Sequence, residues 1–188
     1  MADDLPRIRF ETREEFEAWM HEHHETAPGV WLVIAKKGAP YTSITRDDLV
    51  EVGLMYGWID GLVNSIDEHS YGQRFTPRRP RGLWSLRNVD IVERLSAAGK
   101  MQPRGQAEVD AAKADGRWDR AYAGQAQPQE DFIAALAAHD GATEFYESLP
   151  KSVKFQMYHQ IQTAVKPGTR AARIAKYVAK IAAGERPA

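Results

Sequence analysis

Apolar side chains recur with a helical period in two segments near the start of the chain. Thr12 followed by Glu15 is a capping-box pattern, and one face then carries residues at i, i+3, i+4 and i+7: Phe16, Trp19, Met20 and His23. A second segment opens at Thr45 and Asp48 and repeats the spacing through Leu49, Val52, Gly53 and Tyr56. Both segments predict amphipathic helices.

Strand patterns lie before, between and after these two helices. Ile8 and Phe10 alternate with arginines, and the unbroken apolar run of residues 30–35 is typical of a strand buried on both faces. Residues 57–61 (GWIDG) are expected to form the turn that ends the second helix. Residues 62–66 and 71–75 then alternate around a polar turn, which predicts a hairpin whose second strand carries Arg74 and Thr76 on one face.

Beyond Ser85 the chain turns to alanine and other helix formers, with Pro103 and Pro128 placed to open helices and Gly99 and Gly116 to end them. Residues 153–165 and 174–181 continue the helical spacing. The expected fold class is α+β, with a small mixed sheet from the first 80 residues packed with helices and followed by a helical C-terminal half. We expect an α+β core over residues 1–124 and a helical region over residues 125–188, packed on the same domain.

Composition narrows the chemistry. The 188 residues contain no cysteine, which excludes disulfides, thiolate metal sites and cysteine nucleophiles. No apolar run reaches the ~20 residues of a membrane span, and the Met-Ala-Asp-Asp start is unlike a signal peptide, so a cytoplasmic location is expected.

The formal net charge of -1 hides a regional division. Residues 1–70 hold 6 basic and 14 acidic side chains, residues 71–124 hold 11 and 6, and residues 125–188 hold 8 and 6. The nearly neutral net charge disfavours a general polyanion binder, yet the middle third of the chain is basic. Its arginines either pair with the acidic first third or meet around a ligand.

The densest chemical segment covers residues 74–88 (RFTPRRPRGLWSLRN). Two prolines stiffen it, and arginine presents a planar fork of donors suited to carboxylate or phosphate. If a helix begins after Ser85, its amides add to an anion site; Ser85 is otherwise only a helix cap. An anion site and a structural arginine cluster are the two interpretations.

Asp60 is the candidate catalytic carboxylate, because a tryptophan, an isoleucine and glycines around it favour desolvation and a raised pKa. The alternative is an aspartate that binds the amides of its own turn. Lys36 and Lys37 end the buried strand, where they either contact an anion or form the polar rim of the sheet. His21 and Glu25 share a helix face but lack further ligands, so we expect no metal site, and no cofactor motif is present.

Several separated blocks together resemble the YdeI/OmpD-associated (OmdA-like, bacteriocin-protection) family of bacterial proteins. The blocks that carry the resemblance are Val30-Trp31 to Lys36-Lys37, Gly57-Trp58-Ile59-Asp60, Arg74-Phe75-Thr76-Pro77-Arg78, Trp84-Ser85 with Asn88, Gly116-Arg117-Trp118 with Ala121-Tyr122, and Thr169-Arg170 with Arg173. Gly82 and Leu83 stand where a small polar residue is expected before the tryptophan. The resemblance implies a role in protection and no particular reaction or cofactor.

These observations favour a cytoplasmic protein that protects against stress or bacteriocins by binding a small anionic ligand. In this hypothesis the anion is held by Arg74, Arg78 and Lys37, stacked by Trp58 and Trp84, and oriented by Ser85 and Asn88. One alternative is an enzyme that uses Asp60 as general acid or base in the same pocket. A second alternative is nucleic-acid binding through the basic middle third.

Overall fold

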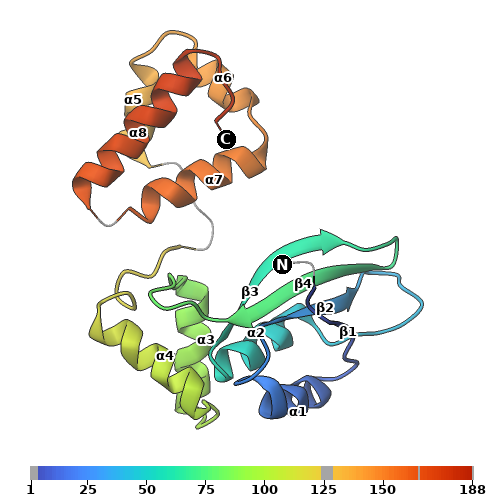
Figure 1. Cartoon of the computed structure of the whole chain (residues 1–188). Coiled ribbons are helices and arrows are strands. Elements are labelled where there is room, and N and C mark those ends of the chain that lie inside the picture. Colours follow the sequence, from blue (N-terminus) through green and yellow to red (C-terminus); the bar gives the residue numbers. More distant parts are fainter. Residues whose placement is uncertain (1–3, 124–128, 165, 188) are drawn as a thin grey trace. The chain divides into compact units, whose positions relative to one another are not determined.

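The computed structural model describes residues 4–123, 129–164 and 166–187, and the chain divides into two compact units (Figure 1). The first unit comprises Met1–Ala121 and the second Tyr122–Ala188. The expected position of the boundary, between residues 124 and 125, lies outside the described residues. That the two units form a single domain stays a prediction.

A four-stranded mixed sheet organises the first unit. Its strands are β1 (Arg7–Ile8), β2 (Val30–Ala35), β3 (Trp58–Ser65) and β4 (Ser70–Pro77), in the order β1-β2-β4-β3. β1 runs parallel to β2, whereas β4 is antiparallel to both of its neighbours. The expected α+β class with a small mixed sheet is confirmed, and β3 is an edge strand.

The four helices of the first unit begin largely where side chains can cap them. They are α1 (Arg13–His23), α2 (Arg46–Met55), α3 (Leu86–Ala97) and α4 (Pro103–Ala114). The side-chain oxygens of Thr12, Thr45 and Ser85 each accept from the backbone N–H three residues later, which satisfies an otherwise unpaired donor. α4 instead has Pro103 in its first turn.

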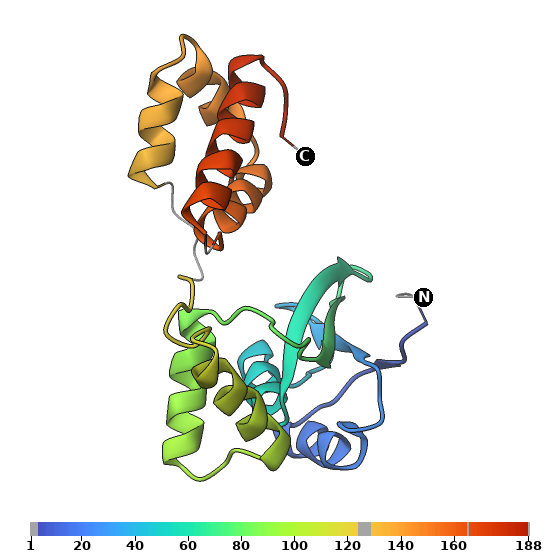
Figure 2. The same ribbon diagram turned by 60° about the vertical axis from the view of Figure 1, so that its left-hand side comes forward.

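One hydrophobic core joins the sheet to these helices. Phe16, Leu49, Trp58 and Phe75 are fully buried in it, and Figures 1 and 2 show α1 and α2 lying against the sheet. Because strand side chains alternate between faces, Phe75 points into this core while its neighbours on β4 point to the other face. This alternation decides which side chains are available to a ligand.

The expectation of a turn over residues 57–61 was wrong in part. Only Gly57 turns, with φ 76°, and residues 58–65 form β3, so the hairpin is longer than expected at the end away from its tip. Ile59 pairs with Thr76 and Asp60 with Phe75. Gly57 and Gly61 suggested a turn, but burial of Trp58 and pairing with β4 hold this stretch extended.

The regular secondary structure elements described in the second unit are all helices. Its helices are α5 (Glu130–Ala137), α6 (Ala142–Ser148), α7 (Lys151–Gln162) and α8 (Pro167–Ala182). α6 is a short helix that the sequence pattern did not predict, and the expected helix positions Pro128 and Val165 lie outside the described residues. A second core, centred on Phe132, Met157 and Ile161, holds these helices together. Among the residues described in both units, no helix has the length and apolar character needed to cross a membrane.

His159 on α7 is expected to make the stability of the second unit depend on pH. It packs edge-on against Tyr122 at 5.0 Å between ring centroids, and burial, with the charge of Arg173, lowers its pKa below the ordinary 6.5. The lowered folded-state pKa means that its contribution to stability is present above pH 6.5 and is lost as the pH falls through the folded-state pKa. We expect the unfolding free energy to decline between pH 7 and 5 in urea titrations, and His159→Gln to flatten that slope. An unchanged slope in the variant would contradict the assignment.

Candidate functional site

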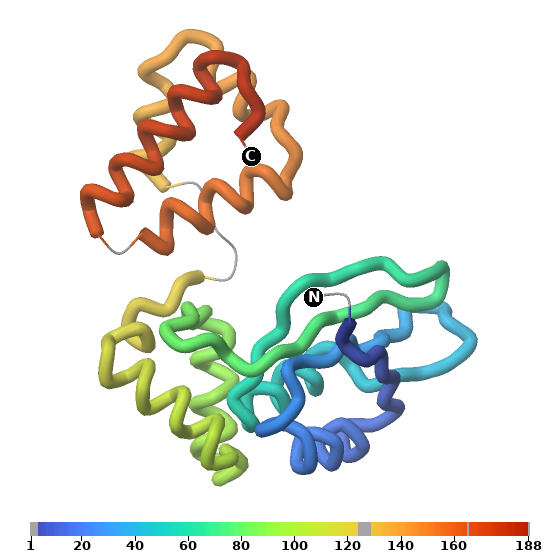
Figure 3. The backbone as a smooth tube through the Cα atoms, viewed as in Figure 1, coloured from blue at the N-terminus to red at the C-terminus, as the bar shows by residue number. Residues whose placement is uncertain are grey.

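A cavity of about 300 Å³ lies at the end of the β3–β4 hairpin that is farther from its tip. Two strands and the loop of residues 78–85 supply its walls; Figure 3 shows this loop leaving β4 for α3. Its lining side chains are mostly polar or charged, and the residues are Ile59, Asp60, Gly61, Arg74, Thr76, Arg78, Arg79, Gly82 and Leu83. The structure therefore brings together four of the sequence-predicted site residues: Asp60, Arg74, Thr76 and Arg78.

Arg74 and Thr76 reach this cavity because they alternate with Phe75 on β4. The Arg74 guanidinium extends across the neighbouring edge strand, since its Nε lies 3.6 Å from the position a Cβ would take on Gly61. Its Nε is buried and forms no hydrogen bond with any described residue. A buried donor without a partner is unfavourable unless something binds it.

Arg78 forms a rigid wall of the cavity. Its side chain is only 5% exposed, its backbone N–H donates to Gly57 O at 2.9 Å, and its Nη2 donates to Leu83 O at 2.7 Å. The guanidinium carbon lies 3.7 Å from the ring centroid of Trp84, a cation–π contact. This packing fixes a positive charge in place before any ligand arrives.

Hydrogen bonds within the loop of residues 78–85 and from Arg117 fix the conformation of this loop. Gly82 N donates to Arg79 O at 2.9 Å, and Arg81 between them adopts the left-handed region with φ 62°. Arg117 donates to Gly82 O at 2.9 Å while its Nε binds Asp115 at 2.7 Å. The loop is thus an ordered turn, and it presents Arg79 at the cavity.

Asp60 is not free at the cavity. Its carboxylate binds Arg46 Nη2 at 2.8 Å, and its side chain is 20% exposed. Arg46 in turn donates to the buried Gln73, which donates to Gly61 O at 2.8 Å. This network ties the start of α2 to the sheet edge and places a guanidinium against the only carboxylate among the cavity's lining residues.

The expected aromatic wall and orienting groups lie elsewhere. Trp58 is fully buried and donates from Nε1 to His24 O at 3.1 Å, and Trp84 is 2% exposed beneath Arg78. Ser85 accepts from Asn88 N at 3.2 Å as the cap of α3, and neither residue lines the cavity. These four side chains support the site from the core.

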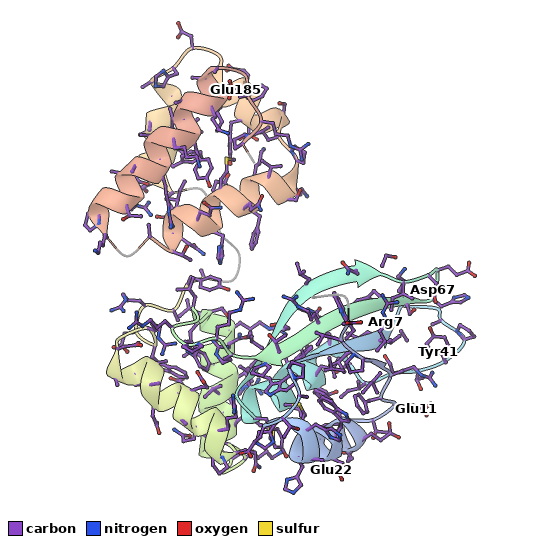
Figure 4. The ribbon with its side chains drawn as sticks, in the orientation of Figure 1. Arg7, Glu11, Glu22, Tyr41, Asp67 and Glu185 are labelled. Atoms are coloured by element: carbon purple, nitrogen blue, oxygen red, sulfur yellow. The ribbon has the colours of Figure 1, made fainter. Side chains whose placement is uncertain are left out.

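Lys36 and Lys37 lie at the opposite end of the sheet. Because β2 runs antiparallel to β4, Val30 is paired with Phe75 near the cavity and Ala35 with Ser70 near the hairpin tip. Lys36 Nζ binds Ser65 Oγ at 3.3 Å and Asp67 O at 2.5 Å, and Asp67 is seen at that tip in Figure 4. The structure does not bring either lysine to the cavity.

The arginines of the basic middle third divide into two groups. Arg87 pairs with Asp47 at 2.7 Å and Arg94 with Glu51 at 3.3 Å, so these two neutralise part of the acidic first third. In contrast, no described carboxylate lies within ion-pair distance of Arg74, Arg79 or Arg81. The arginines without an ion pair to a described carboxylate thus include Arg74 and Arg79, which line the cavity.

A larger cavity, of about 660 Å³, lies between α5 and α8 of the second unit. Its walls are largely alanine with Ile174 and Val178, and its charged residues Asp131 and Arg170 bind each other at 2.7 Å. That pairing, led by the hydrogen bond from Arg170, lowers the pKa of Asp131. Because Asp131 and Arg170 neutralise each other there, the smaller cavity is the better candidate for an anion site. No group of three or more potential metal ligands occurs among the residues described in either unit.

Sequence reasoning did not single out Arg79, Ile59 or Gly61 as lining residues, nor Arg46 as the partner of Asp60. Arg79 lies inside the arginine-rich segment, and Ile59 and Gly61 flank Asp60, so proximity along the chain was an available signal. Arg46 is distant along the chain, and only the packing of α2 beside β3 brings it to Asp60.

The first unit thus combines an α+β fold with an arginine-lined cavity at the edge of its sheet, and the second unit is built from helices. The chain belongs to the family described as Domain of unknown function (DUF8412), whose model matches residues 8–108. Residues 126–184 match the model of the family described as Bacteriocin-protection, YdeI or OmpD-Associated. No curated protein and no solved structure matches the chain.

The second match confirms the resemblance drawn from the sequence, over a narrower stretch. Of the blocks that carried it, only Thr169-Arg170 and Arg173 fall within residues 126–184. The blocks that form the cavity fall within the first match, over residues 8–108. The two matches follow the division of the chain into two units.

Proposed function

We propose that the first unit binds a small anionic ligand in the arginine-lined cavity, and that this binding serves the protective role named in the family description of the second unit. The observation that carries the proposal is the buried Arg74 Nε, which lacks a hydrogen-bond partner among the described residues and lies beside two further cavity arginines. The cytoplasmic setting expected from the sequence is part of this proposal.

A carboxylate or phosphate group suits this site. Each guanidinium offers several coplanar donors, and the fixed position of Arg78 reduces the entropy lost on binding. Thr76 adds a hydroxyl at the same surface. Asp60 does not oppose an incoming anion strongly, because Arg46 neutralises it.

Binding is favoured over the two alternatives by specific contacts. A general base needs a carboxylate available to substrate, and the Asp60 carboxylate is engaged by Arg46. A nucleic-acid surface needs an extended row of available cations, and Arg87 and Arg94 are paired with carboxylates.

Replacing Arg74 by glutamine is expected to weaken the binding of inorganic phosphate by about 10-fold or more, because a charge-assisted hydrogen bond is lost. The measurement is an NMR titration of the isotope-labelled full chain with phosphate. The backbone amide signals of Gly61 and Gly82 should shift in a saturable manner, and the dependence of these shifts on phosphate concentration gives the affinity.

Lys37→Gln is the matched control, because it removes one positive charge from an exposed residue that lies away from the cavity. It should leave phosphate affinity unchanged within about 2-fold, as expected for a screened distant charge. Equal loss in both variants, or no saturable shift in the unmodified chain, would contradict the proposal.

A further inference from the structure

We infer that the ligand is the carboxyl terminus of an extended peptide, which adds to the sheet as a strand beside β3 and places its terminal carboxylate in the arginine-lined cavity. This inference rests on the proposed function and names the ligand class. It joins two features that the small-anion proposal leaves separate: an open sheet edge and a cluster of arginines at one end of it.

The edge is open and apolar. Among the described residues β3 pairs only with β4, and residues 61–65 are all exposed. Leu62 is 59% and Val63 56% exposed. Proteins usually protect such an edge with charged residues or proline, and residues 61–65 (GLVNS) contain neither. An unprotected edge strand is a template for pairing with another chain.

The direction of β3 fixes which end of a peptide would reach the arginines. β3 runs from Trp58, near the cavity, toward Ser65, near the hairpin tip. A peptide pairing antiparallel to it runs the opposite way, so its carboxyl terminus arrives beside Ile59–Gly61. These three residues line the cavity together with Arg74, Arg78 and Arg79.

Arg74 links the edge to the cavity. Its Nε lies 3.6 Å and its Nη2 3.7 Å from the Cβ position of Gly61, so the guanidinium lies over the edge strand itself. The register irregularity between Asp60 and Val63 interrupts regular pairing at this same point. A strand added along residues 61–65 would therefore end where the ladder is broken and where the three cavity arginines lie.

The dimensions fit a short peptide. Five residues at about 3.4 Å each span roughly 17 Å of edge, so about six peptide residues would cover it and reach the cavity. A second copy of this chain paired through β3 would also cover the edge, but it would place no carboxyl group at the arginines by that pairing. The charge at one end of the edge favours the peptide.

The test uses a synthetic pool of hexapeptides randomised at every position, prepared as free acids and as C-terminal amides. Each pool is passed over the immobilised full chain, and retained peptides are identified by mass spectrometry. The best free-acid peptide is then resynthesised with a fluorescent N-terminus and its affinity is measured by polarisation. We expect retention from the free-acid pool, and at least about 10-fold weaker binding by the amide or by Arg74→Gln, with Lys37→Gln unchanged.

Methylation of single backbone nitrogens in that peptide separates strand addition from simple carboxylate capture. Methylation of any backbone nitrogen that faces β3 should abolish binding, and methylation of the nitrogens between them should not. Only every second amide of an added strand faces its neighbour. Equal affinity of acid and amide, or uniform tolerance of methylation, would overturn the inference.

Failure of the inference and failure of the proposed function are distinguishable. If phosphate shifts the cavity amides but no free-acid peptide is retained, the inference fails and the anion site stands. If neither binds, both fail. A second copy of the chain could occupy the edge instead. In that case sedimentation would show concentration-dependent dimerisation, and the NMR signals of the residue 61–65 amides would broaden at high concentration and sharpen on dilution. That result would also overturn the inference.

Discussion

The full chain carrying Gly105→Ala is expected to lose much of the stability of its first unit. A Cβ on Gly105 would lie 2.0 Å from Met55 O, 2.7 Å from Met55 C and 2.8 Å from Leu54 O. These are backbone atoms at the end of α2, which cannot rotate away as a flexible side chain would. Overpacking commonly costs 1–3 kcal/mol, and an overlap with backbone places this substitution at about 3 kcal/mol or more.

Urea unfolding followed by tryptophan fluorescence measures this loss, because all five tryptophans lie in the first unit. Gly168→Ala is the matched control: it also lies in the first turn of a helix that begins with proline, and a Cβ there meets nothing within 4 Å. The control lies in the second unit, so it should leave the tryptophan-detected unfolding free energy of the first unit unchanged within about 0.5 kcal/mol. A Gly105→Ala variant within 1 kcal/mol of the unmodified chain would show that α2 and α4 separate easily.

Local signals in the sequence predicted the helices of the first unit well. Thr12, Thr45 and Ser85 each cap a helix as their side-chain chemistry requires, and the apolar run of residues 30–35 forms β2. These features depend on interactions within a few residues or on simple periodicity. The close approach of Gly105 to α2, by contrast, joins segments about 50 residues apart and left no pattern in the sequence.

Predicting which side chains meet at the cavity succeeded where the strand pattern was local and failed where it depended on topology. Alternation around Phe75 correctly placed Arg74 and Thr76 on one face of β4. Lys36 and Lys37 were expected to contact the same ligand because they end a central strand. Antiparallel pairing with β4 instead carries them to the hairpin tip, and strand direction in a sheet is not encoded by composition at the strand end.

The sequence showed that the middle third of the chain is basic, but only the structure shows which of its arginines form ion pairs. Arg87 and Arg94 lie on α3, which packs beside α2, and they meet the acidic residues of that helix. Arg79 and Arg81 lie in the loop before α3 and form no ion pair with a described carboxylate of α2. A single basic segment thus serves two purposes: ion pairs between helices and an unneutralised cluster beside the sheet edge.

Trp58→Ala is expected to destabilise the first unit by about 3–5 kcal/mol, the range for removing a fully buried large aromatic ring. Trp58 has no exposed surface, packs edge-on against Trp19 at 5.9 Å between ring centroids, and donates to His24 O at 3.1 Å. Trp58→Phe retains most of the ring volume but leaves that carbonyl without its donor, which costs about 1–3 kcal/mol.

The same pair of variants decides whether Trp58 belongs to the ligand site or to the core. The ring does not line the cavity, so Trp58→Phe should bind phosphate within about 2-fold of the unmodified chain, a difference of about 0.4 kcal/mol. Urea unfolding and the phosphate titration measure the two effects on one sample. If Trp58→Phe lost phosphate affinity but little stability, Trp58 would have to be counted among the ligand-binding residues and not among the core residues that support the site.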